Sequence, residues 1–171
     1  MAIPLNVGPM HFVLDGEDMP PTQGGSTLNF TFETLNSMAD ITGNFPRAQY
    51  YVGGSATITA NFTELDMDDV LALFPSVDEA TKSVRIPIGA NAEDDAVDLI
   101  LRPIIEGEVS NEDTLAIYAP KVIMKPNFNV SFSLSQQRIW TVDFVVLPYD
   151  PLAFDFTMLV FGAVSYTPPG T

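Results

Sequence analysis

Residues 55–63 read Ser-Ala-Thr-Ile-Thr-Ala-Asn-Phe-Thr, so small polar residues alternate with apolar ones along this stretch. The same period of two recurs at 27–33 and 127–135, and residues 138–147 carry a heavier, more apolar version of it. Because successive side chains of a β-strand point to opposite faces, a period of two over this length predicts half-buried strands. The outer faces would carry Ser, Thr and Asn, which favours a sheet face that contacts protein or lines a surface.

Shorter apolar runs predict the remaining strands, and turn-forming residues separate them. These strands are expected at 11–14, 82–89, 96–105, 114–124 and 153–162. A short turn at Gln136-Gln137 would join 127–135 and 138–147 into a hairpin.

One short helix is predicted over residues 66–74. Asp66 can accept the free amide hydrogens of the first turn, and Pro75 would end the helix. At ~1.5 Å per residue the helix is about 14 Å long, so it needs a sheet to pack against. The expected fold class is therefore all-β with one short helix, arranged as a β-sandwich.

The chain has 171 residues, a length that suits one domain over residues 1–171. Residues 1–9, interrupted by Pro4 and Pro9, are expected to form an N-terminal arm, and 164–171 a C-terminal tail.

A long loop is predicted over residues 36–52, and loops beyond ~12–15 residues are usually functional. It contains Phe45, Arg47, Tyr50 and Tyr51, and Tyr and Arg are residue types that anchor interfaces. A loop that packs its aromatic side chains on its own domain is the alternative.

Composition excludes several function classes. Cysteine is absent, which excludes disulfides and thiolate metal sites, and His11 is the single histidine. Twenty-two acidic residues and seven basic ones give a net charge of −15. Tight nucleic-acid binding needs clustered Lys and Arg, so the acidity indicates a solvated surface or a halophilic or marine origin. No segment approaches the ~20 apolar residues of a membrane span, and the N-terminus does not resemble a secretory signal.

Candidate chemistry is sparse. The Asp66–Asp69 cluster and the acidic turns 91–95 and 106–113 admit calcium as an alternative to solvated acids. Asp143 stands in an apolar strand, where pairing with Arg138 or Arg102 is expected, and His11 is expected to be a packed or edge residue. No nucleophile–base pair can be drawn, and nothing singles out two of the acids for glycoside cleavage. No catalytic, cofactor-binding or metal-binding residue is therefore assigned, and the chain is not expected to be an enzyme.

The order of these parts resembles the tail tube (major tail) proteins of long-tailed bacteriophages. The resemblance lies in three segments. A strand runs into an acidic-capped helix at 56–75, a Pro-Lys step lies within 115–125, and an aromatic-rich strand followed by Asp lies at 138–150.

This resemblance implies a structural subunit of the virion tail, made in the host cytoplasm. Six copies would form a ring whose inner sheets, completed by neighbouring subunits, join into a barrel, and stacked rings would form a hollow tube that delivers DNA. Tail-tip and tail-terminator proteins would be further partners. Five residues on the most regular strands are expected to face the lumen, although alternation alone does not say which face is inward: Glu33, Asn61, Thr63, Ser131 and Ser133.

The predicted loop would contact the next ring through Phe45, Arg47, Tyr50 and Tyr51. Alternatives are a carbohydrate-binding β-sandwich module and another virion β-protein. A carbohydrate-binding module needs a row of exposed aromatic side chains, and Trp140 is the single tryptophan.

Overall fold

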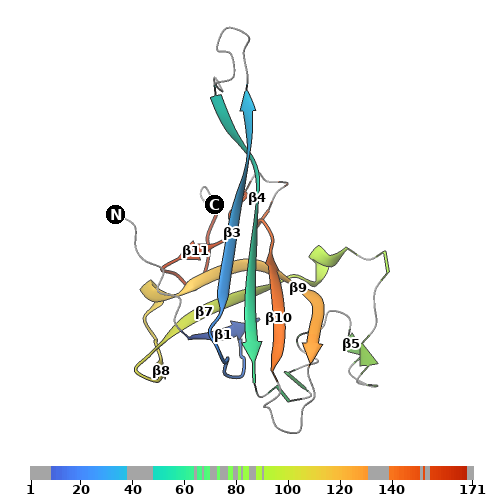
Figure 1. Cartoon of the computed structure of the whole chain (residues 1–171), viewed down its shortest axis with the longest axis vertical. Coiled ribbons are helices and arrows are strands. Elements are labelled where there is room, and N and C mark those ends of the chain that lie inside the picture. Colours follow the sequence, from blue (N-terminus) through green and yellow to red (C-terminus); the bar gives the residue numbers. More distant parts are fainter. Residues whose placement is uncertain are drawn as a thin grey trace.

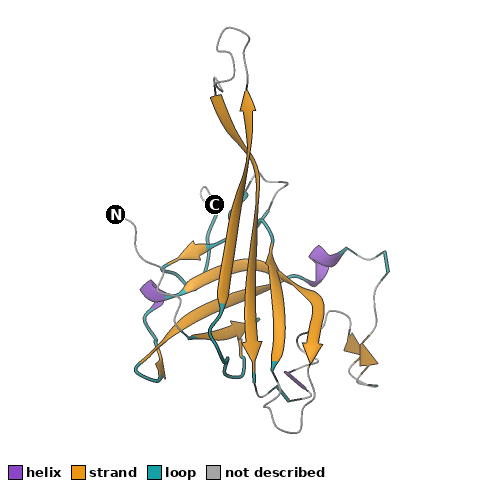
Figure 2. Ribbon diagram, viewed as in Figure 1, coloured by secondary structure: helices purple, strands orange, loops and turns teal. Residues whose placement is uncertain are grey.

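The computed structural model describes most of the chain. The described residues are 9–37, 48–63, 65–66, 68–69, 73, 77–78, 81, 83–84, 88–89, 91–130, 139–150, 152 and 155–168. Strands dominate this part of the chain, as Figure 2 shows.

The strands follow one another along the chain with few helical turns between them. Their bounds are β1 Met10–Leu14, β2 Glu17–Asp18, β3 Thr27–Ser37, β4 Ala48–Phe62, β5 Val77–Asp78, β6 Ser83–Val84, β7 Val97–Ile105, β8 Glu108–Val109, β9 Ile117–Val130, β10 Trp140–Val146 and β11 Val160–Phe161. A 3₁₀ turn, η2 (Ala92–Asp95), lies in the first acidic turn. A second, η3 (Asp113–Leu115), begins at the last residue of the other acidic turn, which also contains β8.

One antiparallel sheet connects most of these strands in the order β2-β1-β7-β9-β10-β4-β3, with β11 paired to β9 and β8 to β7. The first part of β9 pairs with β7 and its later part with β10. In Figure 1, β1, β7 and the first part of β9 cross the direction of β3, β4 and β10. The sheet therefore folds over itself through β9 into two layers, which confirms the all-β prediction.

The core lies between these layers. The ring of Phe12 on β1 lies 5.5 Å from that of Phe62 on β4 and 6.1 Å from that of Phe144 on β10. All three side chains are fully buried. Burial alternates along β4 and β10 as the sequence predicted, with buried residues Ala56, Ile58, Ala60, Phe62, Val142, Phe144 and Val146.

The predicted helix start is confirmed at Asp66. Its Oδ1 accepts the N–H groups of Asp68 and Asp69 at 2.9 and 2.8 Å, and Asp69 Oδ2 accepts the Asp66 N–H at 3.1 Å. The Leu73 N–H donates to the Asp69 carbonyl at 3.1 Å, an i to i−4 helical bond. Asp66 thus caps the first turn, while much of 66–74 lies outside the described residues.

The loop predicted over 36–52 is wrong at both ends. Strand β3 continues to Ser37 and β4 begins at Ala48, and these two residues pair with each other. Gly53 and Gly54, a pair typical of turns, lie within β4, where a Cβ at Gly54 would come 3.2 Å from the Thr31 carbonyl oxygen. Here glycine permits close approach of two strands rather than a turn.

Three further strand predictions need correction. Of the strand predicted over 82–89, the structure describes β6 at Ser83–Val84, and residues 88–89 form a turn. Residues 117–130 form the single strand β9, where two strands were predicted. Within it, residues 126–128 lie opposite Val142 alone, and this bulge accommodates Pro126. The strand predicted over 153–162 is reduced to the two residues of β11. The predicted turn at Gln136-Gln137 and residues 1–8 of the arm lie outside the described residues.

The interlayer aromatic contact supports a stability prediction. Replacing Phe144 with Ala leaves a cavity beside Phe12 and should lower the free energy of unfolding by about 3–5 kcal/mol. Phe156→Ala is the matched control, because that side chain is 62% exposed, and it should change stability by no more than about 0.5 kcal/mol. Urea unfolding followed by Trp140 fluorescence measures both. Equal losses in the two variants would contradict this assignment of the core.

Candidate functional site

Two surfaces of the β3–β4 region are distinctive, and the first is the outward side of the sheet. Here the register places Thr27 opposite Thr59, Asn29 opposite Thr57 and Thr31 opposite Ser55. We call this side the polar face: Thr27, Asn29, Thr31, Glu33, Ser55, Thr57, Thr59, Asn61, Thr141 and Asp143.

Of the residues predicted to face a lumen, the structure brings Glu33 and Asn61 onto the polar face. Thr63 follows the end of β4, and its Oγ1 donates to the Pro21 carbonyl at 3.2 Å. Ser131 and Ser133 lie outside the described residues.

Hydrogen bonds between neighbouring strands order the polar face. Thr59 Oγ1 donates to Asp143 Oδ1 at 2.6 Å, and Thr141 Oγ1 donates to Asn61 Oδ1 at 2.8 Å. The expected pairing of Asp143 with Arg102 is wrong, because Arg102 Nη2 donates to Asp113 Oδ1 at 3.0 Å. The other candidate, Arg138, lies outside the described residues. Asp143 thus has a structural partner on the same face.

The remaining candidate groups form local pairs. His11 Nε2 lies 2.9 Å from Asp18 Oδ1, consistent with an edge histidine. Lys121 Nζ donates to Glu93, and this hydrogen bond and charge hold the pKa of Glu93 below its ordinary value. Within the described residues there is no group of three His, Cys, Asp or Glu side chains placed to hold a metal ion. The same residues include no helix long and apolar enough to cross a membrane.

The second surface is aromatic and lies on the opposite side of β3. The rings of Phe30 and Phe32 lie 4.7 Å apart, and that of Tyr51 lies 5.5 Å from Phe32. A register shift between Glu33 and Thr34 pairs Thr34 with Tyr51, which brings Tyr51 to this side. These three residues form what we call the aromatic strip, and they are exposed by 41%, 62% and 77% in that order.

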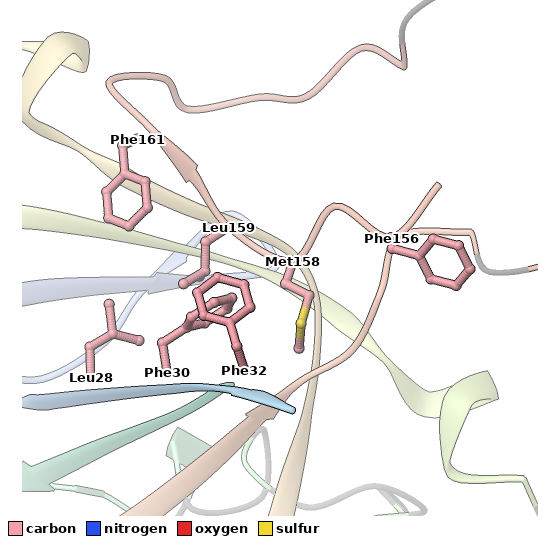
Figure 3. Close-up of a pocket in the computed structure, with 7 residues that line it drawn as sticks. All are labelled: Leu28, Phe30, Phe32, Phe156, Met158, Leu159 and Phe161. Carbon is pink, nitrogen blue, oxygen red and sulfur yellow. The ribbon is translucent and has the colours of Figure 1, made fainter. Parts of the chain in front are cut away.

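The aromatic strip continues into an apolar groove of about 600 Å³. Leu28, Phe30 and Phe32 of β3 form one wall. The other wall comes from the C-terminal segment, as Figure 3 shows, through Phe156, Met158, Leu159 and Phe161.

Hydrogen bonds around Asp155 hold the C-terminal wall of the groove. Tyr166 Oη donates to Asp155 Oδ2 at 2.8 Å, and the Thr157 N–H donates to Asp155 Oδ1 at 3.0 Å. Asp150 and Asp155 also exchange backbone hydrogen bonds. Hydrogen bonding by Thr157, aided by Tyr166, holds the pKa of Asp155 below its ordinary value of 3.8. Tyr166 belongs to the predicted tail 164–171, so part of that tail is tied to the domain.

No family model matches the sequence, and no curated protein matches it. Solved structures do share its fold. A chain of the PVC sheath–tube complex, an extracellular contractile injection system in its extended state, is 12% identical with a TM-score of 0.52, covering 83% of this chain and 86% of that one. A chain of the anti-feeding prophage cap, which terminates a tube, is 14% identical with a TM-score of 0.52, covering 85% and 88%.

A chain of the PVC sheath/tube terminator is 11% identical with a TM-score of 0.50, covering 84% of this chain and 93% of that one. The class of fold is therefore the β-sandwich found in the tube assemblies of contractile injection systems. The resemblance to tail tube proteins is confirmed at the level of the fold.

Sequence reasoning selected Tyr50 and Tyr51 but placed them on a loop, and it missed the aromatic strip and the groove. The period of two at 27–33 assigns Phe30 and Phe32 to a buried face. This pattern does not reveal that β3 continues beyond the strands that would bury the rings of Phe30 and Phe32. Phe45 and Arg47 lie outside the described residues.

The Asp155 contacts predict how stability depends on pH. The pKa of Asp155 is lower in the folded protein than in the unfolded chain, so its ionised carboxylate stabilises the fold at any pH above the unfolded pKa. This stabilisation is lost as the pH falls through the folded pKa. Tyr166→Phe removes one hydrogen-bond donor to Asp155, so the pKa of Asp155 should rise. The free energy of unfolding should fall at neutral pH and stay unchanged at a pH below both the folded and the unfolded pKa of Asp155. Carboxyl NMR titration and urea unfolding at the two pH values test this. Tyr149→Phe, which removes a hydroxyl from the neighbouring ring, should leave the titration unchanged.

Proposed function

We propose that this chain is a structural subunit of a hollow tail tube and acts without catalysis. Six copies form a ring, their sheets join into a barrel around the lumen, and rings stack into a tube that delivers phage DNA. Tail-tip and tail-terminator proteins bind the two ends, and the assembled tube belongs to the virion tail. The fold likeness to injection-system tube assemblies supports the class of function.

The observation that carries the proposal is the polar face. Of these ten residues, eight are Ser, Thr or Asn and two are acidic. The register also places Val145 on this side opposite Thr57, and the cation of Lys125 opposite the carboxylate of Asp143. Duplex DNA carries one charge per ~1.7 Å of axis and is held by clustered cations. A wall of hydroxyl and amide groups offers DNA little to bind, so Glu33 and Asn61 are proposed to face the lumen, together with Thr63, Ser131 and Ser133.

One edge of the sheet supports assembly with other copies. Among the described strands, β3 pairs with β4 alone, so its other edge has free backbone groups. Such an edge pairs readily with a strand of another chain. We propose that the neighbouring subunit completes the sheet here, and that Phe45, Arg47, Tyr50 and Tyr51 contact the next ring.

The carbohydrate-binding alternative has less support. The aromatic strip is a row of exposed rings, but Phe30 and Phe32 are inclined by 78°, and Phe32 and Tyr51 by 59°. Sugar rings stack on the faces of aromatic rings, and these faces point in different directions, so the strip offers no continuous platform for a polysaccharide.

Negative-stain microscopy of the purified protein over a range of concentrations and salt tests the proposal. Rings or tubes with a central hole are expected, and they should become more abundant as concentration rises. A monomer that persists at every concentration and binds polysaccharide would contradict the proposal and favour the alternative.

The lumen assignment has a matched charge test. Glu33→Lys places a cation on the polar face, and Glu108→Lys makes the same charge change on the exposed strand β8. Tubes carrying Glu33→Lys should bind duplex DNA with an affinity that falls steeply with salt, while Glu108→Lys tubes should bind as weakly as the wild type. Filter binding measures both, and equal binding by the two variants would refute the assignment.

A further inference from the structure

One row of residues across the polar face differs from its neighbours. The register places Asp143 of β10 opposite Thr59 of β4 on one side and opposite Lys125 of β9 on the other. These three strands lie side by side in Figure 1. The next row along holds Thr57 and Val145, which carry no charge. Among the residues that the described register brings across this face, Lys125 is the one cation.

The side chain of Lys125 is exposed, so it is within reach of a polyanion on this face. Lys and Arg hold duplex DNA by neutralising phosphates and releasing their counterions. A single cation in each copy recurs in every subunit of an assembly. On a face that otherwise offers hydroxyl, amide and carboxylate groups, this lysine is the group that DNA would bind first. A conduit made of such copies therefore needs the charge of Lys125 to be cancelled locally.

Asp143 is placed to cancel that charge. Opposite residues of an antiparallel pair have Cβ atoms about 4.5–5.5 Å apart, so the carboxylate acts on the Lys125 ammonium group within the screening length of about 8 Å. Thr59 Oγ1 donates to Asp143 Oδ1 at 2.6 Å, and this hydrogen bond orients the carboxylate from the other side. Asp143 is half-buried, and a carboxylate in such a place needs polar partners.

The other cations of the described ranges follow the same rule. Arg102 Nη2 lies 3.0 Å from Asp113 Oδ1, and Lys121 Nζ contacts Glu93. Each of these two cations has a carboxylate beside it. The third Lys or Arg side chain in the described ranges is the lysine of the polar face, and it too has an acid across from it.

We propose that Asp143 neutralises Lys125 in the lumen and so prevents this lysine from holding the DNA that passes. This inference rests on the proposed function, because it takes the polar face to line the lumen. The net charge of −15 is spread over the whole chain, and only acids within about 8 Å of the lysine reduce its attraction for DNA. Glu33, the second acid of the polar face, lies opposite Gly53 and has no cation across from it.

Matched substitutions test the pairing through DNA binding. Asp143→Asn removes the charge and keeps an oxygen that can accept the Thr59 hydrogen bond. Glu33→Gln removes the same charge from the same face and is the control. Fluorescence anisotropy of a short DNA duplex should show binding to Asp143→Asn that is at least about tenfold tighter at low salt and falls more steeply with salt. Glu33→Gln should change the affinity by less than about twofold.

Substitutions of the lysine complete the cycle. Adding Lys125→Gln to Asp143→Asn should abolish the gain in affinity. Lys125→Gln alone changes an exposed position and tests the pairing without altering Asp143. Because the charge of this lysine is already cancelled, the affinity of that variant should stay within about twofold of the wild type, and a tenfold loss would overturn the inference. Melting temperatures check that the variants are folded.

The outcomes separate this inference from the tube proposal. Equal affinities of Asp143→Asn and Glu33→Gln overturn the inference, whether or not tubes form. A gain that survives the addition of Lys125→Gln also overturns it, because another cation then binds the DNA. A gain that requires Lys125, in a protein that microscopy shows to remain monomeric, supports the pairing and argues against the proposed function.

Discussion

The packing of Phe12 against Phe62 and Phe144 is the contact on which the other features depend. β9 carries the sheet from one layer into the other, and these three rings hold the layers together. Once one side of β4 and β10 is buried by them, the period of two commits the other side to the exterior. The polar face is therefore a consequence of where the core lies.

The extent of the core also determines where the β3–β4 hairpin becomes exposed. β4 alternates between buried and half-exposed residues only from Ala56 onward, and residues 49–55 are all exposed. Beyond the body, the pairing with β3 continues although there is no layer to cover it. The aromatic strip therefore begins in the groove, with Phe30 and Phe32, and ends at the exposed ring of Tyr51.

The sequence was sufficient where a single strand or turn decides the structure. Alternation identified the buried set of β4, and an Asp before an apolar stripe identified the helix cap. It failed where the deciding contact was distant. Gly53 and Gly54 resemble a turn until Phe32 and Glu33 are known to lie opposite them, and Pro126 resembles a strand break until its bulge is seen. Phe30 and Phe156 are far apart in sequence, so no local pattern predicts the groove.

Charge bears on the assembly proposed above, because every copy of the chain carries the same net charge of −15. At physiological salt the repulsion between like charges is screened beyond about 8 Å, so acidic residues around a contact matter only at its rim. The apolar groove, which has no charged residue in its lining, can be covered without the cost of burying an unpaired carboxylate. On the polar face, two hydroxyl groups donate to side chains of a neighbouring strand, Thr59 to Asp143 and Thr141 to Asn61. A face made mainly of hydroxyl, amide and carboxylate groups has little with which to hold a polyanion, and this is the property that the proposed conduit requires.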